Sequence, residues 1–164
     1  MNEQEPWYEG QVYGSTPGAA LNASFAADSG YDAVRENLGA PYRMPTNDNH
    51  GELFNSSNID YITEDGEIVT AATSVAKTAA DKRVRVNGIV GLYIRSKANG
   101  KRLFVPCSGY GRGTSRNDRG SNGYYWSSAW SSARYARRLY FYSSGVDPQN
   151  YGNRYLGFAV RAVQ

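Results

Sequence analysis

The sequence of 164 residues has only one cysteine and one histidine. The single cysteine, Cys107, excludes an internal disulfide framework and a zinc site built from several thiolates. It ends the apolar run LFVPC, and free cysteine is among the most buried residue types, so we expect it to be a buried structural residue. His50 stands among Asn and Asp residues with no Cys or Ser neighbour to activate, which predicts a surface role and argues against catalysis.

Acidic residues and long apolar runs are also scarce. Asp118 and Asp147 are the only acids in residues 101–164, too few for the clustered carboxylates of a calcium-dependent sugar site. No stretch approaches the roughly 18 apolar residues of a membrane span. The first residues, MNEQEPW, lack the basic and apolar regions of a signal peptide, so we expect no such leader. We expect no metal, no cofactor and no membrane insertion.

Positive charge is concentrated in the C-terminal part of the chain. Residues 101–164 carry ten Arg and Lys residues against two Asp, a net charge of +8, whereas the whole chain has a net charge of +3. The first hundred residues are therefore acidic on balance. This asymmetry indicates that the C-terminal part forms the surface that meets an acidic or hydrogen-bond-rich partner.

Two short helices are expected in the first half. One covers about residues 31–38 and stops at Gly39, with Pro41 just beyond. The second runs to about Phe54 with Thr46 as its N-cap. The following polar residues predict a loop over 55–82, with one possible edge strand at 67–70.

The second half favours strands and turns, as the 18 Gly and 14 Tyr residues also suggest. Asn99 and Gly100 lie between two apolar runs, at 92–95 and 102–105, which is a strong hairpin signal. Residues 109–123 predict a long loop that is functional or mobile. Further strands are expected at 123–128, 138–143 and 155–163.

Two of these strands alternate between apolar and polar residues, so each has a core face and an outer face. Leu139 and Phe141 point one way, and the outer positions are Arg138, Tyr140 and Tyr142. In the last predicted strand the core face would be formed by Leu156, Phe158 and Val160.

Residues 121–164 have the composition of a combining site. Their 44 positions contain seven Tyr, seven Ser, five Arg and two Trp. Tyr offers a rigid amphipathic ring, Ser an adaptable hydrogen bond and Arg a planar fork, the mixture that antibodies use. We expect this mixture on the outer positions of the 138–143 strand and on two loops, 129–137 and 143–155.

The order of several motifs resembles a known family. The resemblance covers roughly residues 31–54 and 84–164, and its motifs are YDAVR (31–35), YRMPT (42–46), ELF (52–54), NG (99–100) through LFVPCSGY (103–110), GYYWSS (123–128) and GFAVR (157–161). These features resemble the variable proteins that retroelements diversify in phages and bacteria of the gut, and the related paralogous-domain family of bacterial proteins. Both are C-type-lectin-like.

The resemblance implies an α+β, C-type-lectin-like fold with two short helices and a small twisted antiparallel sheet with long loops. It implies a domain over 31–164 with a variable region at about 121–160. Residues 1–30 would then be an irregular lead-in or an assembly segment.

Diversification at template adenines would also explain the composition, because it converts Asn-type codons into Tyr, Ser, Asp, Arg, Gly and Ala codons without creating stops. The residues that look like fixed scaffold are Trp126, Ser127, Ser128, Leu139, Phe141, Gly145, Val146, Gly157, Phe158 and Val160. The candidate variable, ligand-binding residues are Ala129, Trp130, Ser131, Arg134, Tyr135, Arg137, Arg138, Tyr140, Tyr142, Ser143, Asp147, Gln149, Asn150, Tyr151, Asn153 and Tyr155.

The family implies a non-enzymatic protein that binds a host surface molecule, from the tail or capsid decoration of a phage virion. Its partner would be a protein or glycan on a bacterial cell surface, and it would form a homo-oligomer or assemble into the virion. The alternative is a bacterial surface-displayed binding protein with the same fold.

Two other functions rank lower. An oxidase that generates formylglycine shares the fold, but its chemistry needs reactive thiols, and the one cysteine lies in an apolar run. A nucleic-acid-binding module stays open, because Arg residues among Tyr residues could neutralise phosphates and stack on bases.

Overall fold

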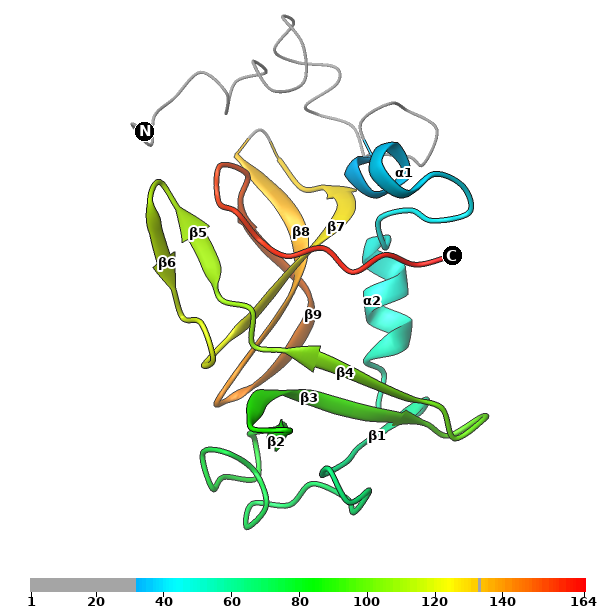
Figure 1. The fold of residues 1–164 in the computed structure, drawn as a ribbon, viewed down its shortest axis with the longest axis vertical. Helices are drawn as coiled ribbons and strands as arrows, with labels where there is room; N and C mark the ends of the chain where they lie inside the picture. The colour runs from blue at the N-terminus through cyan, green and yellow to red at the C-terminus, as the bar shows by residue number, and fades with distance from the viewer. Residues whose placement is uncertain (1–31, 133) are drawn as a thin grey trace, which may run out of the picture.

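The computed structural model describes residues 32–132 and 134–164, so the lead-in expected over 1–30 lies outside the described residues (Figure 1). The described part is α+β, with two short helices and small antiparallel sheets, as the sequence predicted. In Figure 1, α2 runs beside the sheet of β7, β8 and β9, while β3 and β4 cross below both. No helix in the described ranges is long and apolar enough to cross a bilayer.

The first helix, α1 (Ala33–Leu38), is held at both ends. The carboxylate of Asp32 accepts hydrogen bonds from the amides of Val34 and Arg35 at 2.9 and 3.0 Å, and from the amide of Met44 at 2.8 Å. The last of these ties the helix start to the segment that leads into α2. The helix ends at Gly39, which adopts φ +71°, a backbone conformation that glycine tolerates best.

The second helix, α2 (Asn47–Leu53), begins at the predicted cap. The amide of Asn49 donates to Thr46 Oγ1 at 3.1 Å, and the amide of Thr46 donates back to Asn49 Oδ1 at 3.0 Å, a capping box. The surface role predicted for His50 is wrong: only 4% of its surface is exposed. His50 lies on the face of α2 that packs on the sheets, where it lines a small internal cavity of about 40 Å³ with Phe54, Tyr125 and Leu139.

The first sheet is built around β3 (Ile89–Ser96). It pairs antiparallel with β1 (Ile59–Tyr61), β2 (Arg83–Val86) and β4 (Arg102–Pro106). The β3–β4 hairpin was predicted. The loop expected over 55–82 is interrupted by β1 and the edge strand expected at 67–70 is absent, because Ile68 makes only an isolated bridge to Ile62.

The long loop predicted over 109–123 contains a short hairpin. Strand β5 (Tyr110–Arg112) pairs with β6 (Ser115–Asn117) through three residue pairs. The prediction missed this hairpin because the segment has almost no apolar side chains, and backbone pairing alone leaves no alternation in the sequence.

The last sheet consists of β7 (Gly123–Trp130), β8 (Tyr135–Tyr142) and β9 (Gly145–Asn153), in that order. The loops predicted at 129–137 and 143–155 are therefore wrong, since both are mostly strand. Strand β9 was not predicted because it contains Pro148 and two glycines, residues that are uncommon within strands. Proline is tolerated here because β9 is an edge strand and Pro148 lies at an irregularity in its register with β8.

The strand predicted over 155–163 is also wrong. This segment makes only isolated bridges to three separate parts of the chain: Gly157 to Gly111, Ala159 to Tyr125 and Val163 to Arg43. The predicted core face of this segment is also wrong, because Val160 is 38% exposed.

The burial predicted for Cys107 is confirmed. Burial raises the pKa of its thiol to about 12.

The main core lies between the sheets and α2. Phe141 and Leu139 are 0% and 2% exposed, which confirms the alternation predicted for β8. They meet Leu92, Ile94 and other buried residues of the first sheet. One face of β8 is therefore buried in the core. The side chains on its other face do not belong to the core and are available for another role.

Candidate binding site

The register of the last sheet decides which side chains share its outer face. Arg138 of β8 lies opposite Trp126 of β7 and Asn150 of β9, and Tyr140 lies opposite Tyr124. Residues that pair directly across antiparallel strands project to the same side. We call these five residues, with Tyr142 and the Phe158 ring that packs on them, the aromatic face.

The rings of this face form a continuous ladder. Tyr140 stacks on Tyr142 with ring centroids 4.9 Å apart, and on Tyr124 at 5.0 Å. Phe158 continues the ladder, with centroid distances of 5.2 Å to Tyr124 and 4.2 Å to Trp126. Such pairs stabilise beyond the area they bury and hold one another in place.

Arg138 lies at the centre of the ladder. The central carbon of its guanidinium is 4.9–5.0 Å from the ring centroids of Tyr124, Tyr140 and Phe158, three cation–π contacts. Its Nε donates to Asn150 Oδ1 at 2.9 Å, and Asn150 Nδ2 donates to Asp147 Oδ2 at 2.7 Å. The side chain is therefore oriented by an amide that is itself oriented by a carboxylate.

The charge of Arg138 is not paired within the described part of the chain. No carboxylate there forms an ion pair with it, and neither terminal nitrogen, Nη1 or Nη2, donates a hydrogen bond to a described residue. Burial lowers the pKa of this guanidinium, while the nearby Tyr124 and Tyr140, the carboxylate of Asp147 and Tyr110 raise it. An arginine starts high enough to stay charged at neutral pH.

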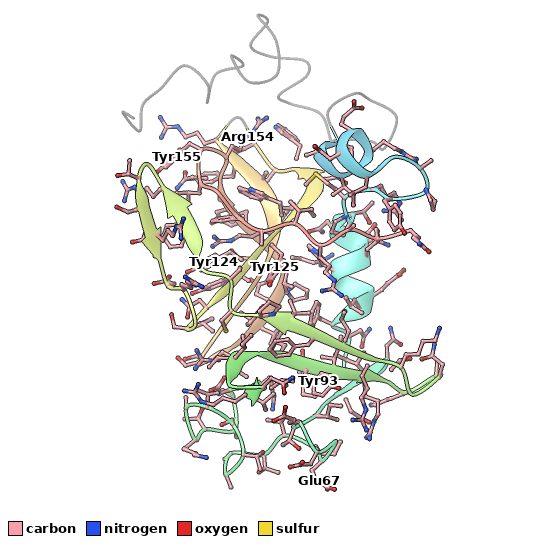
Figure 2. The ribbon with its side chains drawn as sticks, viewed as in Figure 1. Glu67, Tyr93, Tyr124, Tyr125, Arg154 and Tyr155 are labelled. Carbon is pink, nitrogen blue, oxygen red and sulfur yellow. The ribbon has the colours of Figure 1, made fainter. Side chains whose placement is uncertain are left out.

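Tyr124 is fixed from outside the sheet. Its hydroxyl donates to Asp118 Oδ2 at 2.5 Å, and Asn122 Nδ2 donates to the same carboxylate oxygen at 3.1 Å. Burial raises the pKa of Tyr124, and the Asp118 contact raises it further, so the phenol keeps its proton. The neighbouring Tyr125, also labelled in Figure 2, belongs to the core and donates to the carbonyl of Pro106 at 2.6 Å.

An open cleft of about 330 Å³ lies against this face. Its lining residues are Tyr110, Tyr124, Tyr135, Arg138, Tyr151, Gly152, Asn153, Leu156 and Phe158. Gly152 is essential to its shape, because a Cβ atom there would come within 2.9 Å of Arg138 Nη1 and 2.7 Å of the Phe158 ring. Among the lining residues only Arg138 carries a charge.

No family model, curated protein or solved structure matches this chain. The site must therefore be judged on its own geometry. Within the described ranges, no group of three or more His, Cys, Asp or Glu residues could hold a metal ion.

The structure divides the predicted ligand-binding residues between elements and faces. Arg138, Tyr140, Tyr142 and Asn150 meet on the aromatic face. Arg137 and Tyr151 pair with each other; Tyr151 also lines the cleft, whereas Arg137 does not, and Gln149 packs against Gly51 of α2. By element, Ala129 and Trp130 end β7, Ser131 and Arg134 lie in the connection to β8, Ser143 lies in the β8–β9 turn, Tyr155 lies in the turn after β9, and the strands carry Tyr135, Asp147 and Asn153.

Trp130, at the end of β7, is 40% exposed. Figure 2 shows Arg154 and Tyr155 at that same end, beside the β8 start. A contact there is the hydrogen bond from the amide of Arg154 to the carbonyl of Arg134 at 3.0 Å.

Five members of the site were not predicted from the sequence: Tyr110, Tyr124, Trp126, Gly152 and Phe158. Trp126 and Phe158 were assigned to the scaffold, whereas Trp126 lies opposite Arg138 and the ring of Phe158 covers Arg138. The available signal was the alternation in β7, where Tyr124 and Trp126 share a side and Tyr125 takes the other. Gly152 and Tyr110 gave no signal, since the partners that define their role come from distant segments.

Proposed function

We propose that this chain is a non-enzymatic recognition domain of the retroelement-diversified type, with a C-type-lectin-like fold. It binds a protein or glycan on a bacterial cell surface as part of a phage virion. The observation that supports this most is the aromatic face, where the buried Tyr124 and the half-buried Tyr140 flank the guanidinium of Arg138, which forms no ion pair with a described residue. Such residues are the anchors of binding surfaces.

The architecture supports the fold part of the proposal. Two short helices precede the strands, an antiparallel hairpin leads into the last sheet, and the C-terminal segment returns to bridge Arg43. This order is compatible with the C-type-lectin-like arrangement that the sequence motifs imply. Homo-oligomerisation would raise weak single-site binding through avidity.

The direct test replaces Arg138, Tyr140 and Tyr142 together by Ala. Fluorescently labelled protein is then incubated with a panel of gut bacteria, and cell binding is measured for wild type and variant. We expect the variant to fold and to lose cell binding, because these outer side chains do not contribute to the core. The control carries Tyr42→Ala and Arg85→Ala, two exposed residues remote from the last sheet, and should bind as wild type.

Retained binding by the triple variant would contradict the assigned surface. Binding instead to single-stranded oligonucleotides, collapsing between low and physiological salt, would support the nucleic-acid alternative. Reading the DNA around the gene tests the diversification claim. A reverse transcriptase with a near-copy of codons 121–164 that differs only at adenines is expected, and adjacent tail or capsid genes would separate a virion component from a bacterial surface protein.

A further inference from the structure

Arg138 presents a cation to a cleft whose other lining residues are mostly aromatic. The side chain of Arg138 is half-buried, and no described carboxylate forms an ion pair with it. Here Nε is hydrogen-bonded to Asn150, while Nη1 and Nη2 make no hydrogen bond to the described residues. The position of Nη1 is fixed beside Gly152, on the wall of the cleft. The cleft thus offers two preorganised donors and one positive charge.

We propose that this cleft binds a sugar that carries a carboxylate, a hexuronic-acid-type unit of an acidic glycan. The carboxylate is held by the guanidinium of Arg138, and the sugar ring lies against the half-buried rings of Tyr110 and Phe158 that line the cleft. This inference rests on the proposed function, and it names the ligand class of the same site.

The charge balance favours a carboxylate over a phosphate. The planar arginine fork accepts either group. Arg138 is the only charged residue among those that line the cleft, however, and no lysine or second arginine contributes. One fixed positive charge matches one carboxylate, whereas a phosphate monoester carries close to two negative charges at neutral pH.

The remaining lining favours a sugar over a peptide side chain. The volume of about 330 Å³ is at the small end for ligand sites, which suits a single ring-sized unit. Flat aromatic rings match the apolar C–H face of a pyranose, and the cleft also contains the Asn153 amide and tyrosine hydroxyls for the ring hydroxyls. A pyranose has both an apolar C–H face and polar hydroxyl groups.

The site is held rigidly before any ligand arrives. Asp147 orients Asn150, Asn150 orients Arg138, and Asp118 holds the Tyr124 ring that flanks it. Preorganised donors bind without a large cost of ordering side chains. An arginine placed only for stability would not need its terminal nitrogens to face open space.

The test titrates isotope-labelled full-length protein with three probes, followed by amide chemical shifts that include Gly152. The probes are methyl β-D-glucuronide, its neutral counterpart methyl β-D-glucoside, and N-acetylglutamate as a carboxylate without a sugar. The variants are Arg138→Gln and the control Arg137→Gln, whose side chain donates to the Gln149 carbonyl and does not line the cleft.

We expect the glucuronide to bind wild type and the control at least about tenfold more tightly than either other probe, as a charge-assisted contact supplies. Arg138→Gln should remove the preference over the glucoside. Equal binding of glucuronide and glucoside, or no shift with any probe, would overturn the inference. Equal binding of N-acetylglutamate would also overturn it, in favour of a peptide carboxylate. The proposed function is tested separately by the cell binding of the triple variant of Arg138, Tyr140 and Tyr142, whatever the result of the sugar titration.

Discussion

Gly152 lies directly beneath the guanidinium of Arg138. A Cβ atom built on Gly152 would stand 2.9 Å from Arg138 Nη1 and 2.7 Å from the Phe158 ring, closer than side-chain carbons normally approach other atoms. The absence of a side chain at Gly152 therefore lets the Arg138 guanidinium and the Phe158 ring pack directly on the sheet.

Replacing Gly152 by Ala should accordingly displace both Arg138 and Phe158. We expect a loss of about 1–3 kcal/mol in the free energy of unfolding, the usual cost of forcing an extra carbon into a packed site, together with weaker ligand binding. Urea denaturation measures the first effect. The control is Gly111→Ala, whose Cβ would meet nothing closer than 3.8 Å. Equal stability of the two variants would contradict this packing.

His50 should make stability depend on pH. Burial lowers its pKa from 6.5 to about 4, so between these values the unfolded chain binds a proton that the folded chain does not. Stability from neutral His50 is complete above pH 6.5 and is lost as the pH falls towards 4, by about 3 kcal/mol in all.

The measurement is the free energy of unfolding at several pH values from 4 to 8, for wild type and His50→Leu. Arg161 lines the same cavity, and Asp48 and Glu52 lie on the same helix, but these groups are common to both proteins and largely cancel in the difference. Wild type should lose stability relative to His50→Leu as the pH falls from 6.5 towards 4. A constant difference would show that the pKa of His50 is the same in the folded and unfolded protein.

The ion pair between Asp81 and Arg83 should be the most sensitive polar contact of the chain's middle part. Asp81 accepts from Arg83 Nε at 2.8 Å and from the amide of Ala76 at 2.6 Å, and Arg83 Nη1 donates to the carbonyl of Ser121. Burial alone would raise the pKa of Asp81, but the Arg83 and Ala76 hydrogen bonds and the Arg83 charge lower it.

Asp81→Asn should therefore cost about 3–5 kcal/mol, because it leaves the Arg83 charge buried without a partner. The control is Asp60→Asn, which breaks a more exposed pair with Arg95 and should cost below about 1 kcal/mol. The contribution of Asp81 is present above the ordinary pKa of an aspartate and is lost as the pH falls through its lowered value. The free energy of unfolding of both variants is measured in urea. Similar decreases for Asp81→Asn and Asp60→Asn would contradict the greater contribution assigned to the buried pair.

Sequence reasoning succeeded where local chemistry decides structure. The Thr46 cap, the Gly39 stop and the turn at Asn99 and Gly100 each have a signal within a few residues. The two faces of β8 were also predictable, because Leu139 and Phe141 alternate with polar neighbours. Each of these features needs no knowledge of the rest of the chain.

Features whose structure depends on contacts with a distant segment of the chain were not predicted. Strand β9 pairs by its backbone with β8, although its proline and glycines argue against a strand. His50 was assigned to the surface because its neighbours are polar, yet the helix turns its ring towards Tyr125 and Leu139. The candidate site was half predicted: Arg138, Tyr140 and Tyr142 came from alternation, whereas Phe158 and Gly152 depend on how the C-terminal segment returns.

That returning segment has a consequence for how the protein is made. Residues 157–163 fasten three places that are far apart in the chain, and the bridge between Val163 and Arg43 joins positions at opposite ends of the described part. Helix α2 and the β3–β4 hairpin can form while synthesis is still under way, since their contacts are local. The cover over Arg138 cannot, because Phe158 follows all of these elements in the chain. The binding cleft is therefore completed only after the C-terminal segment has left the ribosome, and a nascent chain exposes its aromatic face until then.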